Sequence, residues 1–452
     1  MTSHKFLIAI GILLCSMLHS TAQAALQGDE ASNSSLAASQ SGPLTLNQCI
    51  EIALQRHPLL QSARHQIANA EAGIKVSKSA ARPQVGLAGG YTQNNGQPSG
   101  GIVSSLPEGF SAGVVAKQLI SDGGRTTASI QSAKYTLAST TASYNEVEQN
   151  VILGAHQSYY GVLAAEQLVD AQVQARNLSE LHTKEAKARY DEGIAPKADV
   201  TKAEVELANA ELSLIRARNN MALAYSSLNN ALSLPITTTL KLSGQIHSQQ
   251  VQPGLEDSLS AAYANRPELK RMEAQVQAAQ SEIQAAGSAT KPAFYLTGGG
   301  MWPRTTGGIR SDGETTWTVG LTASINLSDG GETRARVQQA RETVGKLKSD
   351  LEYEKQQIEL EVQQTLLNVI EADQRVTTAI KLIDQAEENY RIAQGRYKEG
   401  IGPMIDVVDA ETTLTAARTS HVQAILDSLM SRAKLDKATG QGISPEGAMN
   451  EK

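Results

Sequence analysis

The feature that most constrains this chain is a tandem repeat with an offset of 207 residues. The stretch RYDEGIAPKAD at residues 189–199 recurs as RYKEGIGPMID at residues 396–406, with seven residue types in the same places. The motif SDGG also occurs twice at the same offset. The chain is therefore two copies of one unit, residues 44–240 and 250–439, and its fold must use that unit twice.

Each copy contains a long stretch without proline, residues 124–190 and 331–398. In the second stretch, apolar residues from Val337 to Val369 recur mostly every three or four positions, which predicts a coiled-coil-like helix. At 1.5 Å per residue each helix would be about 100 Å long, too long for the core of one globular domain. The glycine of each repeated turn should end the long helix, and return helices are expected at about 197–232 and 404–438.

Before each long helix the pattern changes to a period of two. In WTVGLTASINL, apolar residues from Trp317 to Leu327 alternate strictly with small or polar ones. This alternation is typical of strands. It predicts one hairpin in each copy, with strands at about 84–94, 109–121, 293–302 and 315–328.

The N-terminus has the layout of a secretory signal. Lys5 precedes the apolar run FLIAIGILL, and AQA at residues 22–24 is a cleavage motif, so we expect residues 1–24 to be removed on export. Residues 25–43 and the tail 440–452 are expected to be disordered. Cleavage would leave Cys49 as the single cysteine, so the fold should rest on packing without an internal disulfide.

Charge and motif content argue against several functions. The formal net charge is −6 and no basic cluster occurs, so no nucleic-acid partner is expected. The histidines are scattered without metal-ligand spacing, and no Ser-His-Asp or Cys-His arrangement can be placed. We therefore expect no enzymatic activity, no cofactor and no required metal.

Four amphipathic strands are too few to cross a membrane alone, because spanning barrels begin at about eight strands. Three copies would supply twelve strands and twelve helical pieces, which cyclic symmetry would close into one tube. Strands that enter a membrane therefore predict an oligomer.

This ordered set of features resembles the TolC-like outer-membrane efflux proteins over about residues 44–440. The carriers of the resemblance are the tandem repeat, SDGG at each strand-to-helix junction, and the turns RYDEGIAPKADV and RYKEGIGPMIDVVDAE. It implies a mainly α fold with a membrane β segment, in which a tandem-repeat protomer has long coiled-coil-like helices plus four β-strands. The homotrimer would form a twelve-stranded β-barrel continuous with an α-helical barrel.

The resemblance also implies a location and partners. The chain would lie in the outer membrane of a Gram-negative bacterium, contact outer-membrane lipid and extend into the periplasm. A periplasmic adaptor (membrane fusion) protein and an inner-membrane pump of RND, ABC or MFS type would be its partners. It would passively conduct substrates from the energised pump to the exterior, in efflux or type I secretion. The resemblance does not identify the transported substrate.

The resemblance places a gate at the periplasmic tip. Asp406 and Asp409 match the constricting aspartates of the family, and their spacing of three puts both carboxylates on one helix face. Three chains would gather six carboxylates at one aperture, where a divalent cation could block. For Asp199 and Asp406 the alternative is stabilisation of a helix start, because both copies carry that acid. Asp409 instead aligns with Lys202.

Two tyrosines and the turn residues complete the predicted site. Tyr397 matches a family tyrosine that helps hold the tip closed, and Tyr190 occupies the same place in the first copy; packing of the turn is the alternative. The arginine of the closing network in the family's best-known member aligns with Gly402, so that latch cannot form from this position. The residues expected to dock the adaptor are Gly193, Ile194, Pro196, Gly400, Ile401 and Pro403.

A different class of function also has long helical hairpins: the soluble periplasmic coiled-coil adaptor. Adaptors place one hairpin between the halves of other domains, whereas this chain has two hairpin repeats, each preceded by a strand pair suited to lipid. The alternative predicts recovery in the soluble periplasmic fraction.

Overall fold

The computed structural model describes residues 42–92, 109–244, 254–305 and 316–441. The predicted signal peptide, nearly all of residues 25–43 and most of the tail 440–452 lie outside these ranges. The chain divides into two units. In the described part of the smaller unit, Leu44 and Leu242 form a parallel bridge, and the Leu44 N–H donates to the Lys241 carbonyl at 2.7 Å.

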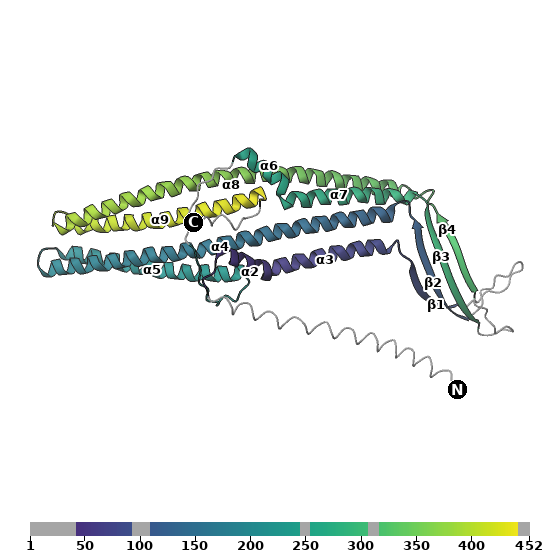
Figure 1. Cartoon of the computed structure of the whole chain (residues 1–452), viewed down its shortest axis with the longest axis horizontal. Coiled ribbons are helices and arrows are strands. Elements are labelled where there is room, and N and C mark those ends of the chain that lie inside the picture. Colours follow the sequence, from purple (N-terminus) through teal and green to yellow (C-terminus); the bar gives the residue numbers. More distant parts are fainter. Residues whose placement is uncertain (1–41, 93–108, 245–253, 306–315, 442–452) are drawn as a thin grey trace, which may run out of the picture. The chain divides into compact units, whose positions relative to one another are not determined.

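The larger unit contains the named helices and strands, and the two copies follow the same order (Figure 1). The elements of the first copy are α2 (Leu46–Arg56), α3 (Pro58–Ser79), β1 (Gln84–Thr92), β2 (Gly109–Ser121), α4 (Arg125–Asp191) and α5 (Lys197–Ala231). The elements of the second copy are α6 (Leu255–Asn265), α7 (Pro267–Gly287), the short 3₁₀ helix η1 (Ser288–Thr290), β3 (Ala293–Thr305), β4 (Thr316–Ser324), α8 (Glu332–Lys398) and α9 (Met404–Thr439).

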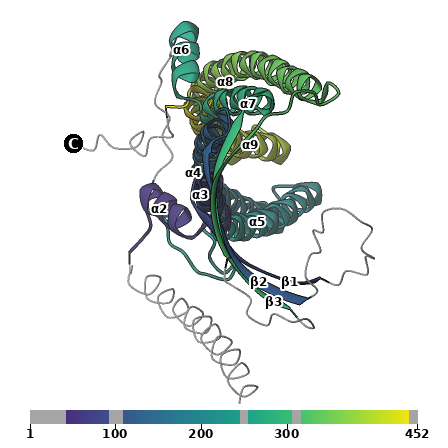
Figure 2. The same cartoon turned by 90° about the vertical axis from the view of Figure 1, so that its right-hand side faces the viewer.

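The four strands form one antiparallel sheet in the order β1-β2-β3-β4. The register aligns Leu87 with Val114, Val114 with Gly300, and Gly300 with Trp317, so the apolar sets of the separate strands fall on one face. That face is open in the single chain, where Leu87 is 87% exposed and Trp317 is 78% exposed. Figure 2, in which the side of Figure 1 that holds the strands faces the viewer, shows that the sheet is curved.

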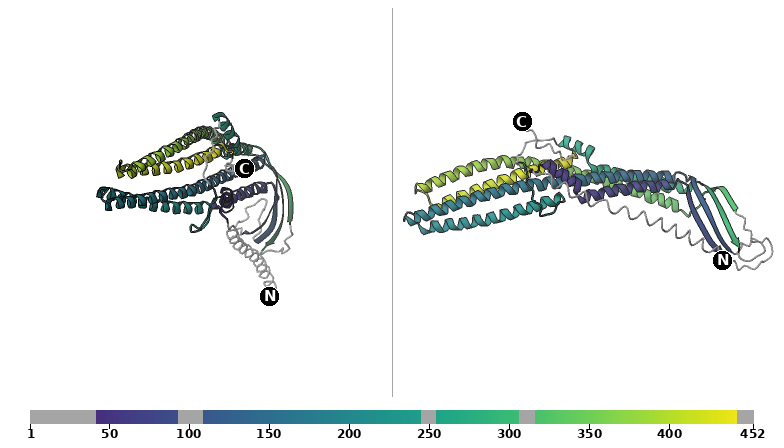
Figure 3. Two further views of the ribbon diagram at one scale, coloured as in Figure 1. Left: turned by 60° about the vertical axis from the view of Figure 1, so that its left-hand side comes forward. Right: turned by 60° about the horizontal axis from the view of Figure 1, so that its bottom comes forward.

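The long helices form two antiparallel hairpins, α4 with α5 and α8 with α9 (Figure 3). The shorter α3 and α7 pack against α4, and α7 also packs against α8. Contacts between α4 and α9 join the two copies. Within this unit the sheet lies at one end of the hairpins and both repeated turns lie at the other (Figure 1).

The Asp of each SDGG motif holds the first turn of the long helix that follows. The Asp122 carboxylate accepts a hydrogen bond from the Thr126 N–H at 2.8 Å, and Asp329 accepts one from the Thr333 N–H at 2.9 Å. The residue just before each helix is a glycine in the left-handed region, with φ of 95° at Gly124 and 91° at Gly331. The motif thus combines a tight turn with a helix cap.

Two strand limits and two helices differ from expectation. β4 ends at Ser324 rather than 328, because its partner β3 begins at Ala293, directly after a proline that has no N–H to pair. β3 extends to Thr305 because Gly109 of β2 pairs with that residue. The sequence predicts only a short helical segment before each hairpin, whereas α3 and α7 are 22 and 21 residues long. Their Ala- and Gln-rich sequences have few large apolar residues to mark a period.

None of the helices in the described ranges contains an apolar segment long enough to cross a membrane.

Candidate functional site

The two repeated turns have the same backbone geometry. Gly193 and Gly400 end α4 and α8 in the left-handed region, with φ of 72° and 74°. In each turn the isoleucine that follows the glycine donates its backbone N–H to the carbonyl of the arginine five residues earlier. The Ile194 N–H lies 2.8 Å from the Arg189 carbonyl oxygen, and the Ile401 N–H lies 3.0 Å from that of Arg396. This is the glycine-terminated helix end that the sequence predicts.

The prolines stand just before the return helices. Pro196 and Pro403 are extended, with ψ of 155° and 158°, and α5 and α9 begin at the next residue. Between glycine and proline, Ile194 and Ile401 are exposed at 68% and 70%. The turn residues predicted to dock an adaptor therefore present one open apolar side chain in each turn.

The tyrosines of the two turns differ in environment. Tyr397 is only 4% exposed, whereas Tyr190 is 44% exposed. The Arg189 guanidinium lies over the Tyr397 ring at 4.7 Å and donates to the Lys398 carbonyl at 2.8 Å. The buried Tyr397 hydroxyl has no hydrogen-bond partner among the described residues. Burial raises the pKa of Tyr397, and the nearby charge of Asp199 adds to the effect.

Tyr397 belongs to an apolar cluster at the tip that joins both hairpins. Met404 and Val407 of α9 are completely buried there beside Tyr397. The other buried members are Ala186, Val200, Ala203, Ala393, Val408 and Ala410. Because the members come from α4, α5, α8 and α9, the tip of each hairpin depends on the other for its packing.

The three aspartates fall into two environments. Asp199, near the start of α5, is half-buried, and burial raises its pKa. Asp406 and Asp409 are exposed on α9, on the side away from the buried Met404, Val407 and Val408. Neither of those two carboxylates forms an ion pair within the described part of the chain. The single chain therefore brings Asp199 close to Tyr397 and leaves Asp406 and Asp409 open.

A buried polar cluster lies further along the same contact between the copies. The Ser179 hydroxyl of α4 donates to Glu411 Oε1 of α9 at 2.7 Å. His182 Nε2 lies 2.9 Å from the Tyr390 hydroxyl of α8 and 3.7 Å from Glu411 Oε2. Sequence reasoning missed these residues, because each is an isolated polar residue in its own helix. Only the packing of α4 against α8 and α9 brings them together.

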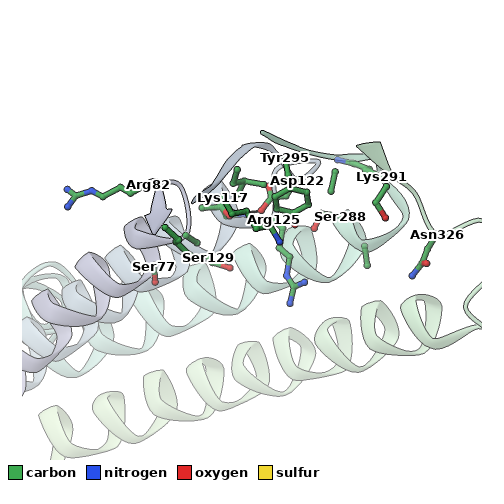
Figure 4. Close-up of a pocket in the computed structure, with 17 residues that line it drawn as sticks. Ser77, Arg82, Lys117, Asp122, Arg125, Ser129, Ser288, Lys291, Tyr295 and Asn326 are labelled. Atoms are coloured by element: carbon green, nitrogen blue, oxygen red, sulfur yellow. Dashed lines mark hydrogen bonds between the residues drawn. The ribbon is translucent and has the colours of Figure 1, made fainter. Parts of the chain in front are cut away.

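The cavity shown in Figure 4 lies where the sheet meets the helices and has a volume of about 690 Å³. Its lining includes Arg82, Lys117, Arg125 and Lys291. Lys117 Nζ lies 4.1 Å from the centre of the Tyr295 ring, and Lys291 Nζ donates to a backbone carbonyl at 3.1 Å. The side chains of Arg82 and Arg125 extend in different directions (Figure 4). The positive charges therefore do not converge on one ligand position.

Across the part of the chain that the structure describes, no three His, Cys, Asp or Glu side chains are placed to hold a metal ion. The exposed Asp406 and Asp409 supply two carboxylates from one chain, which is fewer ligands than a cation site needs.

The family model described as "Outer membrane efflux protein" matches residues 49–233 and 258–441, which are the two copies. The chain belongs to the outer membrane efflux protein family. It is accordingly an outer-membrane efflux channel that extends into the periplasm, and it is not an enzyme. The prediction of a channel is confirmed, and the alternative of a soluble periplasmic adaptor is wrong.

Individual relatives agree with this family. The chain is 23% identical over 400 residues to the outer membrane efflux protein BepC of Brucella suis, covering 88% of this chain and 85% of that protein. In fold it is similar to the outer-membrane channel OprN, with a TM-score of 0.78, 18% identity, and coverage of 88% and 90% of the two chains. The Campylobacter jejuni outer membrane channel CmeC gives a TM-score of 0.76 at 16% identity, with coverage of 89% and 86%.

Proposed function

We propose that this channel works as a homotrimer that passively conducts substrates received from an inner-membrane pump and a periplasmic adaptor, with Asp406 and Asp409 lining its periplasmic aperture. The observation that carries the proposal is a pair of exposed carboxylates beside a buried tip, neither of which forms an ion pair within the described residues. A helix that needed these acids only for its own stability would gain as much from one acid in its first turn. Asp409 lies beyond that turn and has a lysine as its counterpart in the first copy.

The helices support an oligomer. Tyr353, Leu360 and Leu367 of α8 are seven residues apart, which places them in one stripe, and they are 62%, 48% and 56% exposed. In α5, Val205 and Leu212 form a similar stripe and are 51% and 55% exposed. The hairpin partner of each helix therefore leaves these side chains largely uncovered. A second copy of the chain would bury these side chains, each worth about 1.5 to 3 kcal/mol when fully covered.

The sheet supports the same conclusion. Among the described residues, β1 and β4 are the outer strands of the four-stranded sheet. Unpaired backbone groups in lipid cost several kcal/mol each. Pairing β4 of one copy with β1 of the next would remove these edges. With three copies, β4 of the third would pair with β1 of the first and close the ring of strands.

The turns support docking of an adaptor. Ile194 and Ile401 are the exposed apolar residues of two turns with equal geometry, so a trimer would present six similar contacts on one rim. Repetition of this kind suits a partner that is itself built from repeated helical hairpins. The pump would supply the energy, because the chain belongs to a family of channels and not of enzymes.

The test is single-channel conductance of the purified protein in planar bilayers. We expect cation-selective conductance that a millimolar divalent cation blocks, and we expect Asp406→Ala plus Asp409→Ala to reduce both the selectivity and the block several-fold. The matched control is Asp191→Ala plus Glu192→Ala, which removes the same charge from the exposed turn of the first copy. Unchanged selectivity and block in the first variant would exclude Asp406 and Asp409 from the aperture. Failure of the wild-type trimer to conduct would overturn the conduit itself.

A further inference from the structure

The polar cluster of Ser179, His182, Tyr390 and Glu411, here called the junction cluster, links the hairpin of one copy to that of the other. Ser179 and His182 come from α4, Tyr390 from α8 and Glu411 from α9. Its three closest contacts are those between Ser179 and Glu411, between His182 and Tyr390, and between His182 and Glu411. The cluster therefore reports directly on whether the two hairpins are packed together.

The cluster is closed to solvent at its centre. Ser179 is 3% exposed, His182 is 1% exposed and Glu411 is 3% exposed. Glu411 Oε1 accepts the Ser179 hydrogen bond, but Oε2 is buried and has no hydrogen-bond partner among the described residues. A buried carboxylate with one unpaired oxygen is costly when charged, whereas a protonated carboxyl places a neutral O–H there.

The tandem repeat shows that a hairpin of this type packs without such a cluster. At the offset of 207, the counterparts of Ser179, His182, Tyr390 and Glu411 are Ala386, Asn389, Thr183 and Glu204. Glu204 is exposed and pairs with Lys187 at 2.8 Å. The acid is thus present in both copies but is buried in only one of them. Formation of a hairpin does not require that burial.

The charged groups around the cluster come from every neighbouring helix. On α4, Glu185 Oε2 lies 3.4 Å from His182 Nδ1. On α5, Glu206 disfavours ionisation of Glu411. The charge of Lys398 on α8 disfavours protonation of His182, and the charge of Arg418 on α9 favours ionisation of the Tyr390 hydroxyl. Neither Lys398 nor Arg418 forms an ion pair with Glu411 within the described residues. The basic group that lies beside Glu411 Oε2 is His182 Nε2, at 3.7 Å, and it compensates the carboxylate only when it is protonated.

We propose that the junction cluster is a proton-operated latch: Glu411 holds the two hairpins together while it carries a proton, and loss of that proton to solvent separates them. The latch would act beside the turns, and only its effect on conductance rests on the proposed gate. The chemical partner of the site is the proton itself, and the regulated element is the contact between α4 and α9.

The direction of the pH effect follows from burial. Burial raises the pKa of Glu411 from 4.5 to about 7 in the packed arrangement. A carboxyl that binds its proton more tightly when packed contributes stability that is complete below its free pKa and is lost as the pH rises through 7. Burial lowers the pKa of His182, so this group stays neutral at neutral pH and opposes the effect only below about pH 6.5.

The latch can be tested without any conductance. Nitroxide labels at the exposed Lys184 of α4 and Thr413 of α9, in a Cys49→Ala background, report the separation of the hairpins by electron–electron double resonance. Labelled chains are diluted with unlabelled chains so that each oligomer carries at most one pair. The ionisation of Glu411 is followed separately by the infrared band of its carboxyl group, assigned by its loss in Glu411→Gln.

We expect the ratio of separated to packed hairpins to rise roughly fourfold between pH 6.5 and 8.5 in the wild type. Glu411→Gln keeps the Ser179 bond and cannot ionise, so it should stay packed throughout. Glu204→Gln, the counterpart in the first copy, should follow the wild type. The latch is overturned if the wild type and Glu411→Gln give the same distances at every pH, or if the Glu411 carboxyl titrates near 4.5. A channel that fails to conduct would leave both readouts unaffected.

Discussion

At the scale of single residues, the two copies give the same amino acid different surroundings. Tyr190 and Tyr397 occupy equal positions in the repeat, but only Tyr397 is covered by the other hairpin and by Arg189. The sequence predicts the position of each tyrosine, because the turn is marked by glycine and proline. It cannot predict which is buried, since that depends on how α4 and α5 of one hairpin pack against α8 and α9 of the other.

Replacing Tyr397 by phenylalanine is expected to raise the thermal stability of the tip. The change removes a buried hydroxyl that has no described partner, and leaving such a group unpaired costs about 1 to 3 kcal/mol. Tyr190→Phe is the control, because its ring is nearly half exposed and its effect should stay within about 0.5 kcal/mol. Thermal unfolding of the purified variants measures both. A loss of stability in Tyr397→Phe would show that the hydroxyl has a hydrogen-bond partner and would contradict this account.

At the scale of elements, the sequence predicts the long helices closely. They run from Arg125 to Asp191 and from Glu332 to Lys398, within one residue of the predicted limits, because capping residues and left-handed glycines mark both ends. The seam of α8 is less uniform than its period suggests. Ile358, Val362 and Val369 are buried, but Val337 is only half-buried, because apolar spacing does not show how far the partner helix extends.

The turn glycines provide a test of these helix ends. Gly193→Ala or Gly400→Ala should cost roughly 1 to 2 kcal/mol, because each residue has φ above 70° and an added Cβ would strain the left-handed backbone. Neither site has an atom within 4 Å of such a Cβ, so the cost comes from the backbone alone. Gly395→Ala inside α8 is the control and should stabilise by up to about 1 kcal/mol. Equal thermal midpoints for all three variants would contradict this account of the turns.

At the scale of the whole molecule, the proposed trimer depends on surfaces that one chain leaves open. The apolar face of the sheet, its two edge strands and the stripes on α5 and α8 are all exposed in the protomer. The sequence predicts the apolar face, since strict alternation needs no tertiary knowledge. It does not predict the stripes, because an apolar residue in a long helix could face its own hairpin or another copy.

Charges placed on the α8 stripe should therefore break the oligomer without unfolding the chain. Leu360→Glu plus Leu367→Glu introduces two acids into a surface that we propose is buried between copies, where an uncompensated charge is strongly unfavourable. Asn368→Glu, also exposed on α8 but beside the stripe, should leave the trimer intact. Native mass spectrometry in detergent gives the mass of the assembly, and circular dichroism shows whether the helices persist. A double variant that remains trimeric would place the subunit contact elsewhere on the helices. A monomer with full helix content would show that the helices form without the oligomer and that these stripes join the copies.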